Sequence, residues 1–215
     1  MTPSEPPAAQ PSEPAREDRV FRSPLGIAGG VFLLLLAVVL GGDSIIRGEG
    51  RTPWLALASL ILAIPLIVAF TIRPVVYVDD RRLRIRNPFR TIVLPWGSVA
   101  DLRAGYSSEV FTQDGDKYQL WAVPVSLRQR KRAARQAAKA AQDDPHGRTS
   151  ATADVRDSKA RTAPADQTVA DLREMAERHG GSPEAQGEPR IRWAYEIIAP
   201  AAAGLVLLIV LAATG

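Results

Sequence analysis

The residues with the clearest potential for chemistry are arginines that alternate with apolar residues just after position 80. Leu83 and Ile85 lie between them, which is the period-2 pattern of a strand with one wet face. Arginines gathered on one strand face could form a surface that binds a ligand. A solvated strand face without a ligand explains the same pattern. The candidate ligand face consists of Arg81, Arg82, Arg84 and Arg86.

A second basic run lies in an Ala-rich stretch from Ser126 to Asp143, which has high helix propensity and Ser126 as its N-cap. It could lie on an anionic membrane surface, where each Lys or Arg contributes about 1 kcal/mol. The alternatives are a solvated helix without a partner and, less favoured, nucleic-acid binding. The candidate membrane-surface residues are Arg128, Arg130, Lys131, Arg132, Arg135 and Lys139.

Composition excludes several classes of site. The chain has no cysteine and only two histidines, His146 and His179, so thiol nucleophiles, Cys-based zinc sites and three-histidine metal sites are excluded. The Asp114-Gly115-Asp116 sequence supplies too few oxygens for a calcium loop. Nucleophile-elbow, P-loop, zincin and dinucleotide-binding motifs are missing as well. We therefore expect neither an enzyme nor a metal or cofactor site.

Three apolar segments are long enough to span a bilayer, whose hydrocarbon core takes roughly 20 helical residues. They are predicted at 25–42, 53–72 and 193–214, and Glu196 in the third is the only charged residue among them. Pro65 lies in the middle of the second segment and is expected to kink it, which a membrane helix tolerates. The lipid bilayer is thus the first predicted partner.

The distribution of arginines predicts the orientation of these spans. Residues 1–24 carry three arginines and residues 73–90 carry six, whereas the loop at 43–52 carries two, offset by Asp43 and Glu49. Because basic flanks stay in the cytoplasm, the N-terminus and the middle region are expected there, with the C-terminus outside. The prediction is a multi-pass plasma-membrane protein. Residues 1–24, rich in Pro, Ser and Glu, are expected to be a disordered cytoplasmic tail.

Residues 73–127 are predicted to form a small antiparallel β-domain. About six short β-prone runs are separated by turn signals, such as Asp79-Asp80 and the Gln113–Asp116 stretch. Trp96 and Trp121 are expected in its core. An amphipathic helix at 166–180 is expected to cover the sheet, because Val169, Leu172 and Met175 share one face. The basic insert occupies 128–165, and 181–192 is a linker.

The β-region resembles the bacterial pleckstrin-homology-like (PH-like) domains of the low-molecular-weight protein antigen 6 type, which occur mainly in actinobacterial membrane proteins. The residues that carry the resemblance are Leu83, Ile85, Asn87, the Leu94-Pro95-Trp96 turn and Val99-Ala100-Asp101-Leu102. It covers Arg73 to about Leu127 and extends to the later helix, with the long insert as the departure. The resemblance implies the fold and brings no catalytic or binding residue with it.

These features together predict an α+β membrane protein, with three transmembrane helices and a small antiparallel PH-like domain closed by a C-terminal amphipathic helix. Its expected function is that of a membrane-anchored, non-catalytic binding or scaffold module. The cytoplasmic domain would engage a protein partner or anionic lipids of the inner leaflet. The alternative is a subunit of a transport or secretion complex that acts through its transmembrane helices.

Overall fold

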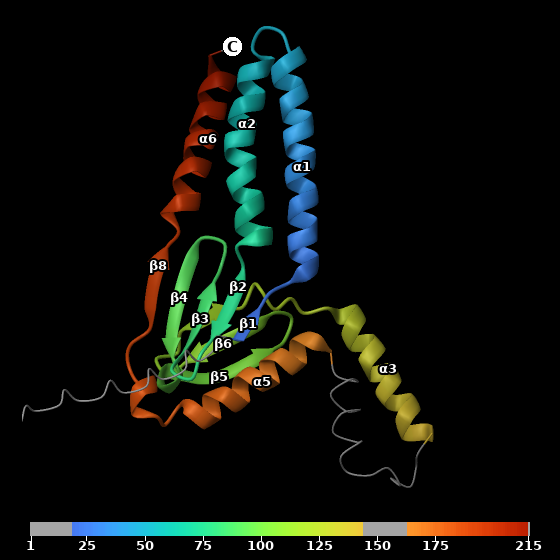
Figure 1. Ribbon diagram of the computed structural model, residues 1–215, viewed down its shortest axis with the longest axis vertical. Helices are drawn as coiled ribbons and strands as arrows, with labels where there is room; N and C mark the ends of the chain where they lie inside the picture. The colour runs from blue at the N-terminus through green and yellow to red at the C-terminus, as the bar shows by residue number, and fades with distance from the viewer. Residues whose placement is uncertain (1–18, 144–162, 215) are drawn as a thin grey trace, which may run out of the picture.

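A computed structural model describes residues 19–143 and 163–214 of the chain. Three long helices stand side by side at one end of the molecule, and the β-strands lie at the other end (Figure 1). Helix α6 ends beside the α1–α2 turn, at the end of the bundle farthest from the strands (Figure 1). The chain therefore passes along the bundle three times, and α6 ends on the side opposite the β-domain (Figure 1).

The long helices are α1 (Pro24–Arg47), α2 (Thr52–Ile67) with its extension η1 (Val68–Ile72), and α6 (Tyr195–Ala213). By length and composition each could cross a membrane, and few of their residues are buried within the protein. Helix α2 lies in the middle and packs against both α1 and α6. The bundle therefore presents apolar side chains on its outer surface, as lipid-facing helices do.

Helix α1 is longer than the sequence predicted. The first segment was expected to end at residue 42, with a loop at 43–52, but the helix continues to Arg47. Asp43 and Arg47 form an i,i+4 ion pair at 2.9 Å, and the Ser44 hydroxyl donates to the Leu40 carbonyl at 2.8 Å. These contacts satisfy polar groups within the last turns, so only four residues connect α1 to α2.

The second long helix changes type beyond Pro65, where the sequence predicted a kink. Proline has no N–H for the helical ladder, and three residues later the α-helix gives way to the π-helical segment η1. The Arg73 N–H then donates to the Val68 carbonyl at 2.9 Å, a step of five residues. This wider last turn delivers Arg73 to the start of the β-domain.

Eight strands lie in the described residues and form two antiparallel sheets. The five-stranded sheet has the order β1-β2-β3-β4-β8, and the three-stranded sheet has the order β5-β6-β7. The bounds are β1 Arg19–Phe21, β2 Val75–Val78, β3 Arg82–Arg86, β4 Arg90–Pro95, β5 Val99–Ala104, β6 Ser108–Thr112, β7 Lys117–Gln119 and β8 Arg190–Trp193, with 3-10 turns η2 at Trp96–Ser98 and η3 at Pro183–Ala185.

Strands β1 and β8 correct two expectations. Residues 19–21 were assigned to a disordered tail, yet β1 pairs with β2 through Val20 and Tyr77. Residues 181–192 were assigned to a linker, yet β8 pairs with β4 through Arg192 and Thr91. Both segments form backbone hydrogen bonds with strands whose edges would otherwise be unpaired. The composition of a segment does not indicate such pairing.

The core lies between the two sheets and helix α5 (Pro164–His179), which packs along β5. Val169, Leu172 and Met175 of α5 are buried, as their spacing predicted. Trp96 is also buried, and its indole N–H donates to the Asp79 carbonyl at 2.8 Å. Trp121, by contrast, was expected in the core but is 42% exposed. It lies at the end of the domain that meets the helices.

Each long helix joins the five-stranded sheet almost directly. Two residues separate β1 from α1, two separate η1 from β2, and one separates β8 from α6. Figure 1 shows these three strands leading into the three helices from the same end of the sheet. Connections this short leave little freedom for a hinge, so the sheet behaves as a continuation of the bundle.

The tight packing of α6 on α2 yields a first prediction. A Cβ at Gly204 would lie 2.5 Å from the backbone nitrogen of Leu62, so a Gly204→Leu substitution must push the helices apart. Overpacking costs about 1–3 kcal/mol, so we expect the apparent Tm of the detergent-solubilised chain to fall by several degrees. The control is Gly29→Leu, because a Cβ at Gly29 meets no atom within 4 Å. An equal fall in both variants would contradict the packing.

Candidate functional site

Arg73 is the polar link between the helices and the β-domain. It follows η1 directly, and only 6% of its side chain is exposed. Its Nη1 lies 2.9 Å from Glu196 Oε1 in the first turn of α6, and its Nε donates to the Asn87 carbonyl at 3.2 Å. Because Glu196 is half-exposed, the ion pair lies at the boundary between the sheet and the bundle. One guanidinium thus connects two helices and a hairpin tip.

Asn87 extends this link into the second sheet. Its side-chain amide donates to the Gln119 carbonyl at 2.8 Å, and its backbone N–H donates to the Arg90 carbonyl at 2.9 Å within the β3–β4 turn. The residue is 4% exposed, so these bonds form away from water. Because the side-chain amide and the backbone N–H of this buried residue are both hydrogen-bonded, they fix the position of the turn. The β3–β4 tip is therefore held against Arg73 on one side and β7 on the other.

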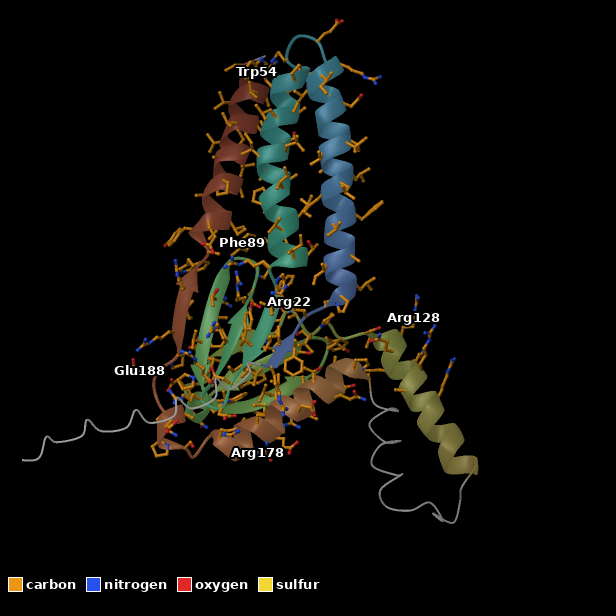
Figure 2. The ribbon with its side chains drawn as sticks, in the orientation of Figure 1. Arg22, Trp54, Phe89, Arg128, Arg178 and Glu188 are labelled. Atoms are coloured by element: carbon orange, nitrogen blue, oxygen red, sulfur yellow. The ribbon has the colours of Figure 1, made fainter. Side chains whose placement is uncertain are left out.

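Apolar contacts surround this polar link. Phe89, at the tip of the β3–β4 turn, packs on a buried group formed by Ala69, Ala194 and Ile197. Figure 2 places Phe89 where the sheet meets α2 and α6. The Phe70 ring lies 5.3 Å from Phe89 and 5.5 Å from Trp121, centroid to centroid. We name the set Ala69, Phe70, Phe89, Trp121, Ala194 and Ile197 the junction cluster.

Next to this junction, the outer face of the five-stranded sheet contains a hollow of about 280 Å³. Strand pairing explains its composition, because residues directly opposite one another share a face. Arg86 pairs with Thr91 and Thr91 with Arg192, while Tyr77 pairs with Arg84 in the next row. The residues that line the hollow, which we call the arginine hollow, are Arg73, Tyr77, Arg84, Arg86, Thr91, Arg192, Trp193 and Glu196.

The electrostatic balance of the hollow is positive. Glu196 is its only acidic lining residue, and Arg73 neutralises it. Arg84, Arg86 and Arg192 form no ion pair among the described residues, although Arg192 is close enough to Glu196 to interact with its charge and Arg86 bonds to Tyr77. Arg84 lies 5.5 Å from the centre of the Tyr77 ring, which stabilises its charge without cancelling it.

The Tyr77 hydroxyl lies in the positive field of the arginines at this surface. Arg22 donates to the Tyr77 hydroxyl oxygen at 3.5 Å, and Figure 2 places Arg22 where β1 leads into α1. This hydrogen bond, joined by one from Arg86, lowers the pKa of Tyr77 below its usual value, although partial burial acts in the opposite direction. The cationic groups around the phenol therefore favour negative charge at this position.

The structure divides the four arginines of the candidate ligand face into two pairs. Arg84 and Arg86 line the hollow. Arg82 forms an ion pair with Asp79 at 3.1 Å, and Arg81 forms one with Glu184 at 3.2 Å. Both of these carboxylates compete with any anionic ligand. We therefore restrict the predicted ligand face to Arg84 and Arg86, and Arg81 and Arg82 become natural controls for them.

The basic residues of α3 (Leu127–Asp143) are also divided. Ser126 caps the helix as predicted, since its hydroxyl accepts from the Gln129 N–H at 3.3 Å. Arg130 is engaged within the protein: it forms an ion pair with Asp166 and donates to the carbonyls of Ala104 and Gly105 at 2.7 Å each. Arg128, Lys131, Arg132 and Arg135 are exposed, and the side chain of Lys139 lies outside the described residues.

Helix α3 runs away from the three long helices, with Arg128 at the end nearest to them (Figures 1 and 2). If the bundle spans a bilayer, a helix in this direction has its first turn closest to the membrane, and each further turn lies about 5.4 Å farther along its axis. Contact between this basic run and a membrane surface stays a prediction, with Arg128 its best-placed residue.

Sequence reasoning did not assign Arg73, Arg192 and Tyr77 to a site. Arg73 was counted only among the six arginines of residues 73–90, and Arg192 and Tyr77 were given no role. A usable signal existed for Arg192, because Arg190-Ile191-Arg192-Trp193 repeats the alternation of the Arg82–Arg86 strand. No comparable signal marks Arg73, whose partners lie 14 and 123 residues away.

Arg73 yields a second prediction. An Arg73→Met substitution leaves the buried Asn87 carbonyl without its donor and Glu196 without its cation. Hydrogen bonds to charged groups contribute about 1.5–3 kcal/mol, so the apparent Tm in detergent should fall by several degrees. Arg47→Met breaks an ion pair of the same 2.9 Å length whose arginine is 80% exposed, and it should leave the Tm almost unchanged. A similar Tm for both variants would contradict the role of Arg73.

Comparison with known proteins agrees with this fold. The family model described as a bacterial PH domain matches residues 73–185, from Arg73 through the β-strands and α5 to η3. Neither the curated proteins nor the solved structures contain a match to the chain. The match covers just over half of the chain. With its two antiparallel sheets and the helix along β5, the chain belongs to the bacterial PH domain family.

Proposed function

We propose that this chain is a membrane-anchored, non-catalytic binding module whose PH domain is held against the cytoplasmic leaflet of the plasma membrane. The observation that carries the proposal is the direct continuation of all three long helices into one sheet, within one or two residues. If the helices span the bilayer, the end of that sheet must lie among the lipid headgroups. PH domains are commonly binding modules for lipids or proteins, which agrees with this placement.

The charges at the three junctions support the cytoplasmic orientation. Arg22 lies between β1 and α1, Arg73 lies between η1 and β2, and Arg192 lies three residues before α6. The opposite end of the bundle has Asp43 paired with Arg47, so its net charge is small. Basic residues beside spans are retained in the cytoplasm, and all three junctions agree in this respect.

Aromatic residues occur at both ends of the bundle. Trp54 lies at the end far from the domain, and Phe89 lies at the near end (Figure 2). Trp193 and Tyr195 flank the start of α6 and are more than half exposed. Exposed aromatic rings at the ends of apolar helices favour the interfaces of a bilayer. The helix bundle is accordingly proposed to span the membrane with the sheet on its cytoplasmic side.

Helix α5 is proposed to be the helix that closes the PH domain, with the insert at 128–165 accommodated between β7 and α5. Arg130 supports this arrangement, because its bonds to Asp166, Ala104 and Gly105 fasten the start of the insert to α5 and to the end of β5. Asp166 raises the pKa of Arg130, which keeps the guanidinium charged. The length and sequence of the insert could then change without disturbing the core.

The domain engages the leaflet first and offers a protein partner a second surface. Strand β8 is an outer strand of its sheet, and all four of its residues are exposed. An extended peptide can add to such an edge through main-chain hydrogen bonds. A protein partner bound there would lie next to the membrane, which suits a scaffold.

The proposed orientation yields a third prediction. The chain has no native cysteine, so single cysteines report accessibility without background. Suitable positions are Glu49, in the turn between α1 and α2, and Tyr106, which is 94% exposed in the β-domain. In intact cells a membrane-impermeant maleimide should label Glu49→Cys, and it should label Tyr106→Cys only after permeabilisation.

The glycines beside Glu49 are unsuitable positions for this experiment. A Cβ at Gly48 would lie 2.3 Å from the Ser44 carbonyl oxygen, and Gly50 has a φ of +60°. Labelling of Tyr106→Cys in intact cells would place the domain outside and contradict the proposal. Labelling of both positions in intact cells would show that the bundle does not span the membrane as proposed.

A further inference from the structure

We propose that strand β8 binds an extended segment of a partner protein in which acidic residues alternate with apolar ones. The inference rests on the proposed function and specifies the protein partner of its second surface. Strand β8 lies outside residues 73–185, so this surface is not part of the matched family domain. Three features of the strand carry the inference, namely its unpaired backbone edge, its uncovered apolar face and its basic face.

One backbone edge of β8 is available for a further strand. Within the described part of the chain, β8 pairs with β4 alone. The Ala194 N–H donates to the Phe89 carbonyl at 2.9 Å, which marks Ala194 as a position that bonds toward β4. Such positions alternate along an antiparallel strand, so Arg192 also bonds toward β4. The backbone N–H and C=O groups of Ile191 and Trp193 therefore point away from β4, toward the unpaired edge.

The inner face of β8 is apolar and uncovered. Ile191 lies directly opposite Ile92, so the two side chains are on the same face of the sheet. Ile92 is completely buried in the core, yet Ile191 is 46% exposed. The second sheet and α5 therefore cover the five-stranded sheet as far as β4 and leave β8 open. An apolar residue on an added strand would pack beside Ile191 and extend the core layer by one strand.

The outer face of β8 is basic. Arg190 and Arg192 alternate with Ile191 along the strand, so both lie on the face away from the core. Both are exposed, and Arg73 already neutralises Glu196, the only acidic residue that lines the adjoining arginine hollow. Carboxylates on the outer face of an added strand would lie next to these arginines. Because side chains alternate between the two faces, the added strand needs acidic and apolar residues in alternation.

The same charges disfavour a second copy of this chain as the occupant. Two copies that span the membrane in the same direction would align their β8 strands in parallel, because each strand leads directly into α6. A two-fold axis would then place each arginine of the basic face opposite its own counterpart. Like charges directly opposite one another destabilise a strand pair. The occupant is therefore a different protein, whose acidic residues meet Arg190 and Arg192.

The test uses a fluorescently labelled peptide of about eight residues, a usual strand length, in which glutamate alternates with valine. The full chain in detergent micelles is titrated into the peptide, and fluorescence anisotropy reports binding against micelles without protein. We expect saturable binding. A peptide with lysine in place of glutamate should bind about tenfold more weakly, because its charge opposes the basic face. A peptide of the same composition with its glutamates and valines in two blocks should also bind about tenfold more weakly.

Ile191→Pro tests the backbone edge. Proline removes the N–H that points away from β4 and keeps the bonds of Arg190 and Arg192 toward β4, which is how an edge strand accommodates a proline. Affinity for the glutamate–valine peptide should fall by about tenfold. The matched control is Ile191→Val, which keeps the N–H and an apolar β-branched side chain and should change affinity by less than about threefold. Unchanged affinity in Ile191→Pro would overturn strand addition.

R190E/R192E tests the basic face and guards against a folding defect in Ile191→Pro. It should reverse the preference, so that the lysine–valine peptide binds more tightly than the glutamate–valine peptide. The matched control is R128E/R132E, which makes the same charge change at exposed residues of α3 and should alter affinity by less than about twofold. Equal losses in the two variants would reduce the effect to overall charge and overturn the proposal. Peptide-free dimers that Ile191→Pro dissociates would overturn the choice of occupant in favour of a second copy.

The outcome of this test is independent of orientation, because detergent micelles have no sidedness. Peptide binding at β8 together with an external Tyr106 cysteine would keep the binding site and place its partner outside the cytoplasm. A cytoplasmic Tyr106 cysteine without peptide binding would keep the proposed orientation and remove β8 as the partner site. Failure of the two proposals can therefore be told apart.

Discussion

The arrangement of this molecule depends on one buried guanidinium at the boundary between apolar helices and a polar domain. Arg73 ends the second long helix, pairs with Glu196 at the start of the third and donates to the carbonyl of Asn87. Burial of a cation costs free energy unless its donors are paired with acceptors, so Glu196 and Asn87 must stay in position. Those partners determine where α6 starts and how the β3–β4 turn meets the bundle. Next to this ion pair, Phe89 packs on the buried members of the junction cluster, Ala69, Ala194 and Ile197.

This constraint has a consequence for the outer face of the sheet. Because β1, β2 and β8 lead into the three helices, the arginines of β3, β4 and β8 keep a fixed height relative to the bundle. A PH domain on a flexible tether would have to find the membrane by diffusion. If the helices span the bilayer as proposed, the covalent connections hold the sheet at the membrane surface, so its binding groups act at a high effective concentration.

Much of the fold could be predicted from the sequence, because its signals are local. The long apolar segments, the turn at Asp79 and the buried face of α5 all follow from composition or periodicity over a few residues. The errors arose where pairing is remote. β1 and β8 are short and exposed, and only their partners β2 and β4 define them as strands. Trp121 was expected in the core because tryptophans of small β-domains usually lie there. Its ring instead contacts Phe70 in η1, which lies 51 residues earlier in the chain and therefore gives no local signal. The same limit applies to the site, since alternation identified Arg84 and Arg86, whereas Arg73 acts through residues far along the chain.

The most direct test of the account is the depth of the domain at a membrane surface. A fluorophore on Ile191→Cys would report the strand next to α6, on the face away from the hollow, and one on Arg178→Cys would report the end of the domain far from the helices (Figure 2). Both variants would be placed in vesicles whose lipids carry a nitroxide on the headgroup, which quenches over short distances. The account predicts strong quenching at Ile191 and little at Arg178. Equal quenching at the two positions would contradict it, because the domain would then move freely relative to the bilayer.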